Sequence, residues 1–200
     1  MALYEVTETF YSLQGEGLHT GRPMFFIRLS GCNLQCDFCD TDYTHKQELT
    51  EYQLLELASK TPTNHILITG GEPLLQDLSP LVKLLKNSNY ILHLETNASI
   101  YDPIVYKFDW VTTSPKSTDF DNRILLSSSE IKIICGIEGW KEIITEVKKI
   151  SFCNRLLLLP LDTRSADPAD IDWTTVALAF CLKNPHFSLC LQTHKLLKIR

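Results

Sequence analysis

The sequence predicts an α/β fold, an incomplete (β/α) barrel of about six parallel strands. Short, almost continuously apolar runs alternate with segments of helical periodicity, which is typical of a parallel sheet covered by helices. The chain of 200 residues is too short for a complete eight-unit barrel, which usually needs about 250 residues. Polar residues follow most of the apolar runs, and β/α folds build their sites at the carboxyl ends of strands.

The predicted elements follow one another along the chain. An extended segment, Glu5–Leu13, precedes the candidate strands Met24–Leu29, His65–Thr69, Tyr90–Glu95, Trp110–Thr113, Ile131–Cys135, Leu156–Leu159 and Phe187–Leu191. Helices are predicted at Glu51–Ser59, Leu78–Lys86, Trp140–Ile150 and from Pro168 to about Leu182. Thr50 and Gln53 form a capping box at the first helix, in which each side chain accepts a hydrogen bond from the other residue's backbone N–H.

The composition is typical of one globular domain, residues 1–200, with 44% hydrophobic and 22% charged residues. Nineteen Lys and Arg residues against 24 Asp and Glu residues give a net charge of −5, which argues against nucleic acid or an anionic membrane as the main partner. The chain does not begin with a basic and apolar leader, and its longest strongly apolar run, Leu156–Leu161, is too short to span a bilayer. A cytoplasmic location is therefore expected.

The chain has seven cysteines, three of which lie close together. Cys32, Cys36 and Cys39 have the spacing C-x3-C-x2-C, and three thiolates can hold three irons of a 4Fe-4S cluster while the fourth iron stays open. A zinc site of three cysteines and His45 is one alternative, and cysteines without a ligand are another. Packed thiols are expected at Cys135, Cys153, Cys181 and Cys190.

The cysteine spacing, an aromatic residue before the last cysteine and a Gly-Gly-Glu-Pro segment after the next strand resemble the radical S-adenosylmethionine (SAM) superfamily. The resemblance implies that the open iron binds SAM, from which a 5′-deoxyadenosyl radical is released. By themselves, Gly-Gly-Glu-Pro and Ser-Pro-Lys would also suit ordinary turns. The resemblance implies cofactor contacts at Phe38, Cys39, Asp40, Gly71, Ser114, Pro115, Lys116, Leu159, Pro160, Leu161 and Asp162.

Two of these positions carry open alternatives. Leu159 stands where the superfamily often has Gln, so a side-chain contact there is left open, whereas a backbone contact with adenine would survive the change. Asp162 either binds a ribose hydroxyl or caps the following loop. At Gly71 the two neighbouring glycines would let the backbone approach a ligand closely.

Further segments resemble the family of 7-carboxy-7-deazaguanine synthases through nearly the whole chain. They are Phe10–Gly17, Phe26–Cys32, Cys39–Thr41 and Gln192–Lys195. The resemblance implies a lyase that converts 6-carboxy-5,6,7,8-tetrahydropterin to 7-carboxy-7-deazaguanine with loss of ammonia, in queuosine and 7-deazapurine biosynthesis. It implies hydrogen abstraction from C6, ring contraction and return of the hydrogen, with no residue of the chain carrying the radical. A small glycyl-radical-enzyme activase and a zinc- or cluster-holding binding module are the rival interpretations.

The substrate residues follow from chemistry and from this resemblance. Arg28 lies in an apolar strand and needs an anionic partner, either the substrate carboxylate or a structural ion pair. Thr41 is implied as a ligand of a magnesium ion (Mg2+), with an N-cap or turn role as the alternative. The edge of a pterin ring could be read by Leu13, Gln14, Gly15 and Glu16.

The resemblance also implies contacts of the substrate with Thr69, with His194 and with the terminal carboxylate of Arg200, for which a frayed terminus is the ordinary alternative. A homodimer and an electron donor such as flavodoxin are the partners that it implies.

Overall fold

The computed structural model describes residues 1–42, 46–150, 155–162 and 171–200. Its strands form one nine-stranded sheet in the order β3-β1-β2-β4-β5-β6-β7-β8-β9. β1 (Leu3–Leu13) pairs antiparallel with both β2 (Pro23–Leu29) and β3 (Gln47–Thr50). From β2 onward all neighbours are parallel, through β4 (His65–Gly70), β5 (Ile91–Thr96), β6 (Trp110–Thr113), β7 (Glu130–Cys135), β8 (Leu156–Pro160) and β9 (Phe187–Leu189).

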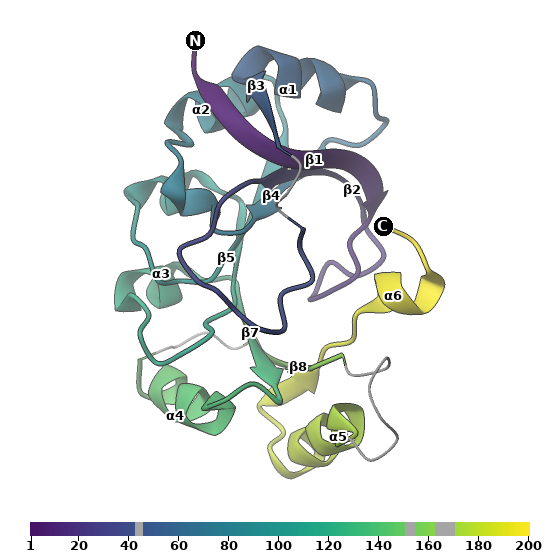
Figure 1. The fold of residues 1–200 in the computed structure, drawn as a ribbon, viewed down its shortest axis with the longest axis vertical. Helices are drawn as coiled ribbons and strands as arrows, with labels where there is room; N and C mark the ends of the chain where they lie inside the picture. Colours follow the sequence, from purple (N-terminus) through teal and green to yellow (C-terminus); the bar gives the residue numbers. More distant parts are fainter. Residues whose placement is uncertain (43–45, 151–154, 163–170) are drawn as a thin grey trace.

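The sheet curves around an interior space without closing, because β3 and β9 are not hydrogen-bonded to each other (Figure 1). The predicted incomplete barrel is therefore confirmed, with seven parallel strands, β2 and β4 to β9, in the described part of the chain. The C-terminal segment, drawn in yellow, lies at the open side of the curved sheet, near the end of β1 and the start of β2 (Figure 1).

Five of the described helices cover the outer face of the sheet and bury one apolar core against it (Figure 1). They are α1 (Glu51–Ser59), α2 (Ser79–Asn87), α3 (Asn122–Ser127), α4 (Trp140–Ile150) and α5 (Trp173–Lys183), with 3-10 turns at Pro73–Leu75 and Pro103–Lys107. A sixth described helix, α6 (Thr193–Leu197), has no buried residue and lies at the open side of the sheet (Figure 1). The predicted capping box of α1 is present, since Thr50 and Gln53 exchange both hydrogen bonds. None of the described helices is long and apolar enough to cross a membrane.

The boundaries differ from the sequence prediction in a few places. The predicted start of the last long helix at Pro168 lies outside the described residues, and the described α5 begins at Trp173 because the Asp172 carboxylate accepts a hydrogen bond from the Thr174 N–H. The last strand ends at Leu189, two residues before its predicted end. The short elements β3, α3 and α6 were not predicted, since four to six residues carry too little periodicity.

The strands alternate between two kinds of surroundings, as the period of two in a β-strand requires. Residues that face the helices, such as Ile27, Ile68 and Leu94, are fully buried in the apolar core. Their neighbours face the inside of the barrel, where Arg28, Thr69, Glu95 and Lys132 line a cavity. The polar side chains of the sheet are therefore collected in its interior, at the carboxyl ends of the strands.

The loop between β1 and β2, residues 14–22, lies inside the barrel against several strands. Its Gly17 N–H donates to the Cys190 thiol at 3.2 Å, and its Leu18 N–H donates to the Glu130 carboxylate at 3.0 Å. Gly17 has a φ of +71°, and a Cβ there would lie 2.2 Å from Glu130 Oε1. A glycine is needed at this position because the loop passes so close to β7.

Candidate active site

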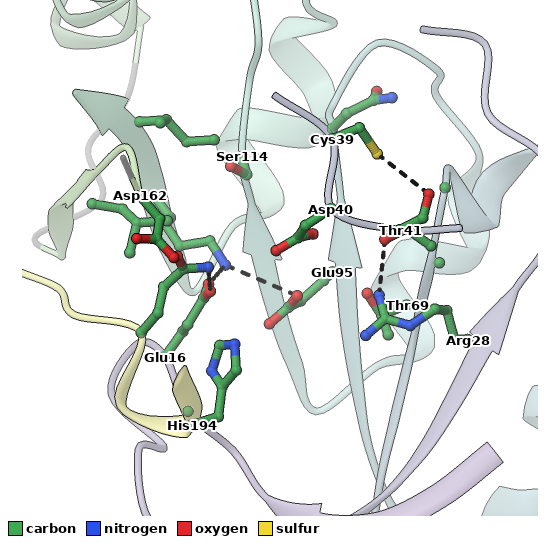
Figure 2. Close-up of a pocket in the computed structure, with 18 of the residues that line it drawn as sticks. Glu16, Arg28, Cys39, Asp40, Thr41, Thr69, Glu95, Ser114, Asp162 and His194 are labelled. Atoms are coloured by element: carbon green, nitrogen blue, oxygen red, sulfur yellow. Dashed lines mark hydrogen bonds and ion pairs between the residues drawn. The ribbon is translucent and has the colours of Figure 1, made fainter. Parts of the chain in front are cut away.

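A cavity of about 460 Å³ opens at the carboxyl ends of the strands (Figure 2). Every residue that the sequence analysis assigned to a site lines it, except Pro115. Pro115 is buried, and its neighbours Ser114 and Lys116 line the cavity. The cofactor contact at Pro115 stays a prediction.

The three clustered cysteines line one part of this cavity. The Cys39 N–H donates to the Cys36 carbonyl at 3.0 Å, which turns the loop back on itself. Burial raises the pKa of the Cys36 thiol, although the nearby Lys116 ammonium acts in the opposite direction. The Asn97 amide supports the loop by donating to Asn33 Oδ1 at 3.1 Å.

No three His, Cys, Asp or Glu side chains among the described residues converge on one point where a single metal ion could bind. A 4Fe-4S cluster does not require such convergence, because each thiolate binds a different iron. Three thiolates in one loop that lines the cavity suit such a cluster. His45, the proposed fourth zinc ligand, lies outside the described residues.

The Gly-Gly-Glu-Pro segment joins the ends of three strands. A Cβ on Gly71 would lie 2.0 Å from the Gly31 carbonyl, so the glycine allows two backbones to pack closely as well as lining the cavity. Glu72 is fully buried and accepts hydrogen bonds from the Thr96 hydroxyl at 2.8 Å and the Asn97 N–H at 2.7 Å. The acidic residue of this segment thus holds the loop in place and does not face the cavity.

Lys116 brings a buried amine to the cysteine side of the cavity. Its Nζ donates to the backbone oxygen of Ser114 at 2.7 Å and to the Ser114 hydroxyl at 2.6 Å. Burial disfavours the ammonium form and, together with the Lys132 charge, lowers the pKa of Lys116 to about 8, although Cys36 and two carboxylates favour the charge. An anionic group that entered the cavity beside Lys116 would find a desolvated cation there.

Arg28 reaches the cavity from β2. Its Nε donates to Glu8 Oε1 at 2.9 Å. Its Nη1 donates to the Thr41 hydroxyl at 3.3 Å (Figure 2). Glu8 also pairs with Arg200 at 3.1 Å. The anionic partner that the sequence analysis required for Arg28 is therefore Glu8 in this structure, while the guanidinium still lines the cavity.

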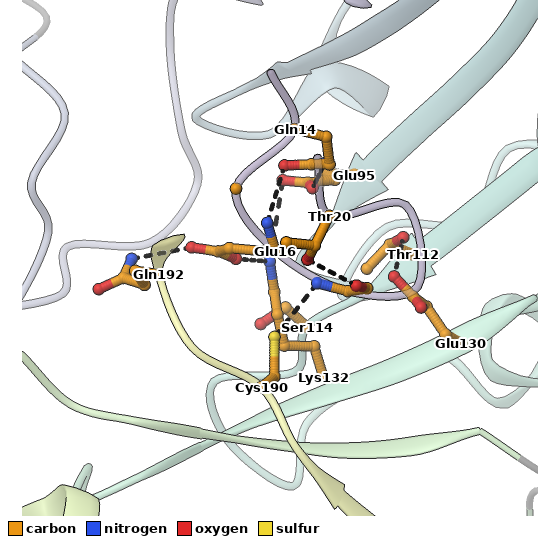
Figure 3. A network of polar contacts seen from close by, with 12 residues as sticks. Gln14, Glu16, Thr20, Glu95, Thr112, Ser114, Glu130, Lys132, Cys190 and Gln192 are labelled. Carbon is orange, nitrogen blue, oxygen red and sulfur yellow. Dashed lines mark hydrogen bonds and ion pairs between the residues drawn. The ribbon is translucent and has the colours of Figure 1, made fainter. Parts of the chain in front are cut away.

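The floor of the cavity is an ionic network built around Lys132 (Figure 3). The Lys132 ammonium pairs with Glu16 Oε2 and lies 3.9 Å from Glu95 Oε2. Gln192 Nε2 donates to Glu16 Oε1 at 2.8 Å, and Gln14 Nε2 donates to Glu95 Oε1 at 3.0 Å. Burial opposes the ionisation of Glu16, but the Lys132 charge and these hydrogen bonds outweigh it and lower the pKa of Glu16 to about 2.

The C-terminal segment forms one wall of the cavity. A Cβ on Gly15 would lie 2.0 Å from His194 Nδ1, so the absence of a side chain at Gly15 makes room for the imidazole. The Thr193 N–H donates to the Gly15 carbonyl at 2.9 Å and the Ser12 hydroxyl donates to the Arg200 carbonyl oxygen. Burial lowers the pKa of His194, which favours the neutral ring.

Lys195 connects this wall to the cysteine loop. Its ammonium lies 2.9 Å from Asp40 Oδ2 and 3.3 Å from Asp162 Oδ2. Asp40 follows the last clustered cysteine and Asp162 follows β8, so one lysine holds together two acidic residues that the sequence analysis assigned to the same ligand. Leu159, Pro160 and Leu161 complete this side of the cavity.

Of the four cysteines expected to be packed thiols, three lie in the described part of the chain. Cys135 and Cys190 are buried, and Cys181 is half-buried against the core, whereas Cys153 lies outside the described residues. Burial raises the pKa of both Cys135 and Cys190 to about 11, so these thiols stay protonated near neutral pH.

Sequence reasoning did not assign Glu95, Lys132, Gln192 and Lys195 to the site. Lys132 carried the clearest signal, because it is a single cation between isoleucines in an apolar strand, the same pattern that identified Arg28. Glu95 and Gln192 stand at strand ends, where polar residues were already noted.

Comparison with known proteins places the chain in a family. The model of the Radical SAM superfamily matches residues 26–165. A 7-carboxy-7-deazaguanine synthase from a Synechocystis species is 37% identical over 98% of this chain and 94% of that protein, and one from Bacteroides thetaiotaomicron is 36% identical over 98% of both. The crystal structure of QueE from Escherichia coli superposes with a TM-score of 0.79 at 26% identity, covering 95% of this chain and 94% of that one. The chain therefore belongs to the radical SAM superfamily and, within it, to the family of 7-carboxy-7-deazaguanine synthases.

Proposed function

We propose that this chain is a radical SAM lyase that converts 6-carboxy-5,6,7,8-tetrahydropterin to 7-carboxy-7-deazaguanine with loss of ammonia, on the route to queuosine and related 7-deazapurines. The observation that carries the proposal is a single cavity lined by the three clustered cysteines, by Arg28 and by the acidic floor. Membership of the superfamily implies a 4Fe-4S cluster and SAM. A binding module without catalysis would not need these three parts to meet.

The cluster and SAM have matching residues in the cavity. Cys32, Cys36 and Cys39 would hold three irons, and when bound the two groups supply the 5′-deoxyadenosyl radical that begins the reaction. Lys116 offers its desolvated ammonium, and Ser114 its hydroxyl, to the polar end of SAM. The Gly71 backbone, Phe38, Asp40 and the segment Leu159–Asp162 lie along the same cavity and would bind the rest of the molecule.

The substrate would occupy the side of the cavity formed by the β1–β2 loop. Its amino and ring N–H groups are hydrogen-bond donors, and the Glu16 carboxylate on the floor would accept hydrogen bonds from them. Its carboxylate matches the planar fork of Arg28, which can bind two oxygens at once. The half-buried His194 ring, neutral because of its lowered pKa, would pack against the pterin and exclude water. Thr69 and the terminal residue Arg200 line the same space.

A magnesium ion would bind next to the substrate through the Thr41 hydroxyl. Mg2+ prefers oxygen ligands and usually keeps several waters, so one hydroxyl together with substrate oxygens is a sufficient set. The Arg28 guanidinium beside Thr41 would repel a magnesium ion. A substrate carboxylate placed between the guanidinium and the ion would offset that repulsion. Magnesium should therefore bind more tightly to the enzyme with substrate than to the enzyme without it.

The partners of the reaction follow from its chemistry. A reductant of low potential must deliver one electron to the cluster, and a flavodoxin is the class of protein we propose. We also propose a homodimer, on the basis of the family alone.

The test is anaerobic reconstitution of the protein with iron and sulfide, followed by incubation with SAM, a chemical reductant, magnesium and the carboxypterin. We expect four irons per chain and a product with the mass of 7-carboxy-7-deazaguanine. Iron binding without any deazaguanine product would contradict the proposal. Installation of a glycyl radical on a partner protein would favour the activase, and zinc in place of iron would favour the binding module.

A further inference from the structure

Lys132 lies at the floor of the cavity and has no place in the function described so far. It comes from the middle of β7, where its neighbours are isoleucines, and its side chain is only 7% exposed. A lysine ammonium is rarely buried unless it is paired, because leaving water costs it several kcal/mol. Here the pairing is with two carboxylates, Glu16 and Glu95, which come from the β1–β2 loop and from β5 (Figure 3).

The geometry leaves both carboxylates able to accept further hydrogen bonds. In each of them one oxygen accepts from a side-chain amide, Gln192 for Glu16 and Gln14 for Glu95, and the other oxygen is turned toward Lys132. A carboxylate oxygen has two lone pairs, so each oxygen can take one more donor. Both glutamates line the cavity, with side chains 13% and 25% exposed. Two negative charges and one positive charge leave a net charge of −1 on this floor.

Other titratable groups surround Lys132, but they do not replace it. The Cys190 thiol faces it from the segment after β9 and stays protonated, because burial raises its pKa to about 11. Lys116, after β6, is attracted by Glu16 and Glu95 and repels Lys132, and its ammonium bonds to Ser114. The His194 ring faces Glu16 from α6, and burial lowers its pKa. Glu130, one layer deeper on β7, accepts hydrogen bonds from the β1–β2 loop and from β6.

We propose that Lys132 is a positioning and specificity residue, which holds the buried Glu16 carboxylate ionised beside Glu95 so that the cavity floor only accepts hydrogen bonds. Such a floor selects ring systems that carry an amino group and ring N–H donors on one edge, and it rejects rings with an oxygen in place of that amino group. The inference rests on the proposed pterin substrate, and it names Lys132 as the residue that decides which ring systems the cavity selects.

Removal of the Lys132 charge should change the chemistry of the floor. Burial opposes the ionisation of Glu16 and the Lys132 charge is the main influence that favours it, so without Lys132 the Glu16 carboxylate takes up a proton more easily. A protonated carboxyl is a hydrogen-bond donor, and facing the N–H donors of a 2-amino-4-oxo ring it would leave them without an acceptor. The same carboxyl would donate to a 2-oxo ring, so the preference between the two rings should shrink.

The experiment measures binding to the reconstituted enzyme with SAM and without turnover. The probes are 6-carboxypterin, which has the 2-amino group, and 6-carboxylumazine, which has a 2-oxo group, each followed by its fluorescence. The variants are Lys132→Met, which removes the charge, Lys132→Arg, which keeps it, and Lys149→Met, an exposed control on α4. Each variant's affinity is divided by that of the unmodified protein at the same pH, which cancels the ionisation of the probes.

The unmodified protein and the exposed control are expected to prefer carboxypterin by about tenfold or more, the discrimination typical of hydrogen bonds to a charged group. Lys132→Met should weaken carboxypterin binding at least about tenfold, with less effect on carboxylumazine. The loss should diminish as the pH rises from 5.5 to 8, because the protonated carboxyl then ionises. Lys132→Arg should retain the preference.

Two results would overturn the inference, and a third concerns the function. Unchanged selectivity and pH dependence in Lys132→Met would show that the charge does not matter, and a loss of selectivity in Lys132→Arg equal to that in Lys132→Met would point to packing instead. If Lys132→Met does not fold by circular dichroism, Lys132→Gln is measured against the same expectations. Failure of the unmodified protein to bind carboxypterin would instead contradict the proposed function.

Discussion

The inside of this barrel holds two polar layers, one of charged side chains and one of neutral rings. The upper layer, Glu16, Glu95 and Lys132, is charged and lines the cavity. The lower layer, which consists of His19, His65, His93 and Trp110, lies toward the amino ends of the strands. His93 precedes Glu95 by two residues on β5, so these members of the two layers lie on the same face of the sheet.

The lower layer consists of neutral rings in contact. His65 Nδ1 and His93 Nε2 are 2.9 Å apart, and Arg22 Nη1 lies 2.9 Å from His65 Nε2. Because an arginine can only donate, a neutral His65 ring carries its proton on Nδ1, and this N–H donates a hydrogen bond to His93 Nε2. The His19 ring packs edge-on against both His93 and Trp110, with ring centroids 4.8 and 4.5 Å apart.

The contrast shows what decides whether a buried group keeps its charge. In the upper layer each charge faces an opposite charge and amide donors, and the pKa of Glu16 falls to about 2. In the lower layer no carboxylate contacts the rings at hydrogen-bond distance among the described residues, and burial lowers the pKa of His93 to about 3. Changes in the upper layer and the cavity above it should therefore affect activity, and changes in the lower layer should affect stability.

The largest effect is expected at the cysteine loop. Cys36→Ala removes one of three thiolates, so iron should be lost on gel filtration and turnover should fall to background. Circular dichroism of the metal-free protein should remain unchanged. Cys181→Ala, at a half-buried thiol packed against the core, is the matched control and should retain iron and turnover. Full activity of Cys36→Ala would show that the cysteine loop, and with it this cavity, is not the active site.

A smaller effect on activity is expected at Arg28. Arg28→Met should raise KM for the carboxypterin by about ten- to a hundredfold, since a hydrogen-bonded charge pair contributes about 1.5–3 kcal/mol. Steady-state kinetics over substrate concentration would measure it. Arg123→Met is the control, because its guanidinium is 60% exposed and pairs with Asp121 outside the cavity. If KM is unchanged in Arg28→Met, the arginine serves only to hold Glu8.

The buried histidines of the lower layer should make the stability of the protein depend on pH. The pKa of His93 is about 3 in the folded protein and about 6.5 in an unfolded chain, so below pH 6.5 the unfolded state takes up a proton that the folded state does not. Stability is therefore lost as the pH falls, by about 2 kcal/mol between pH 7.5 and pH 5 from this residue. Urea unfolding of the unmodified protein and of His93→Gln at both pH values measures it.

The difference in unfolding free energy between these two proteins should shift by that amount, in favour of His93→Gln at pH 5. Equal shifts with pH in both proteins would mean that the ring is protonated in the folded state. Activity at pH 7.5 should be retained by His93→Gln, provided that the protein is folded at the assay temperature.

The smallest effect is expected outside both layers, at the cap of α1. Thr50→Ala removes the side-chain hydrogen bond to the Gln53 N–H and should lower stability by about 1 kcal/mol, with no change in turnover. Thermal unfolding measures it as a decrease of about 2–4 °C. Thr145→Ala, inside α4, has no capping role and should be neutral or slightly stabilising. A loss of activity in Thr50→Ala would show that the outer helices and the cavity are coupled.

The parts of the site that could be predicted are those carried by unusual residues in a short stretch of chain. The three cysteines within one loop, the lone Arg28 and the polar strand ends could be recognised because local pattern and chemistry agree there. The partners of these residues were out of reach. Glu8 is 20 positions from Arg28, and Glu16 is 116 positions from Lys132, so nothing in either local pattern points to the other.

The reason for a residue can also differ from the one its motif suggests. Gly71 was interpreted through a ligand, whereas its closest constraint is the Gly31 carbonyl. Pro115 was assigned together with Ser114 and Lys116, and of these three residues only Ser114 and Lys116 line the cavity.

Residue types and their spacing along the chain were enough to establish the alternation of strands and helices, the cysteine loop and the edge of the sheet where the site would form. These follow from local periodicity and from the fact that parallel strands end together. The curvature of the sheet decided the rest, since it brings β1, β5, β7 and the C-terminal segment around one space. Charge pairing inside that space depends on distances in three dimensions, and only the folded chain determines that Lys132 is held between Glu16 and Glu95.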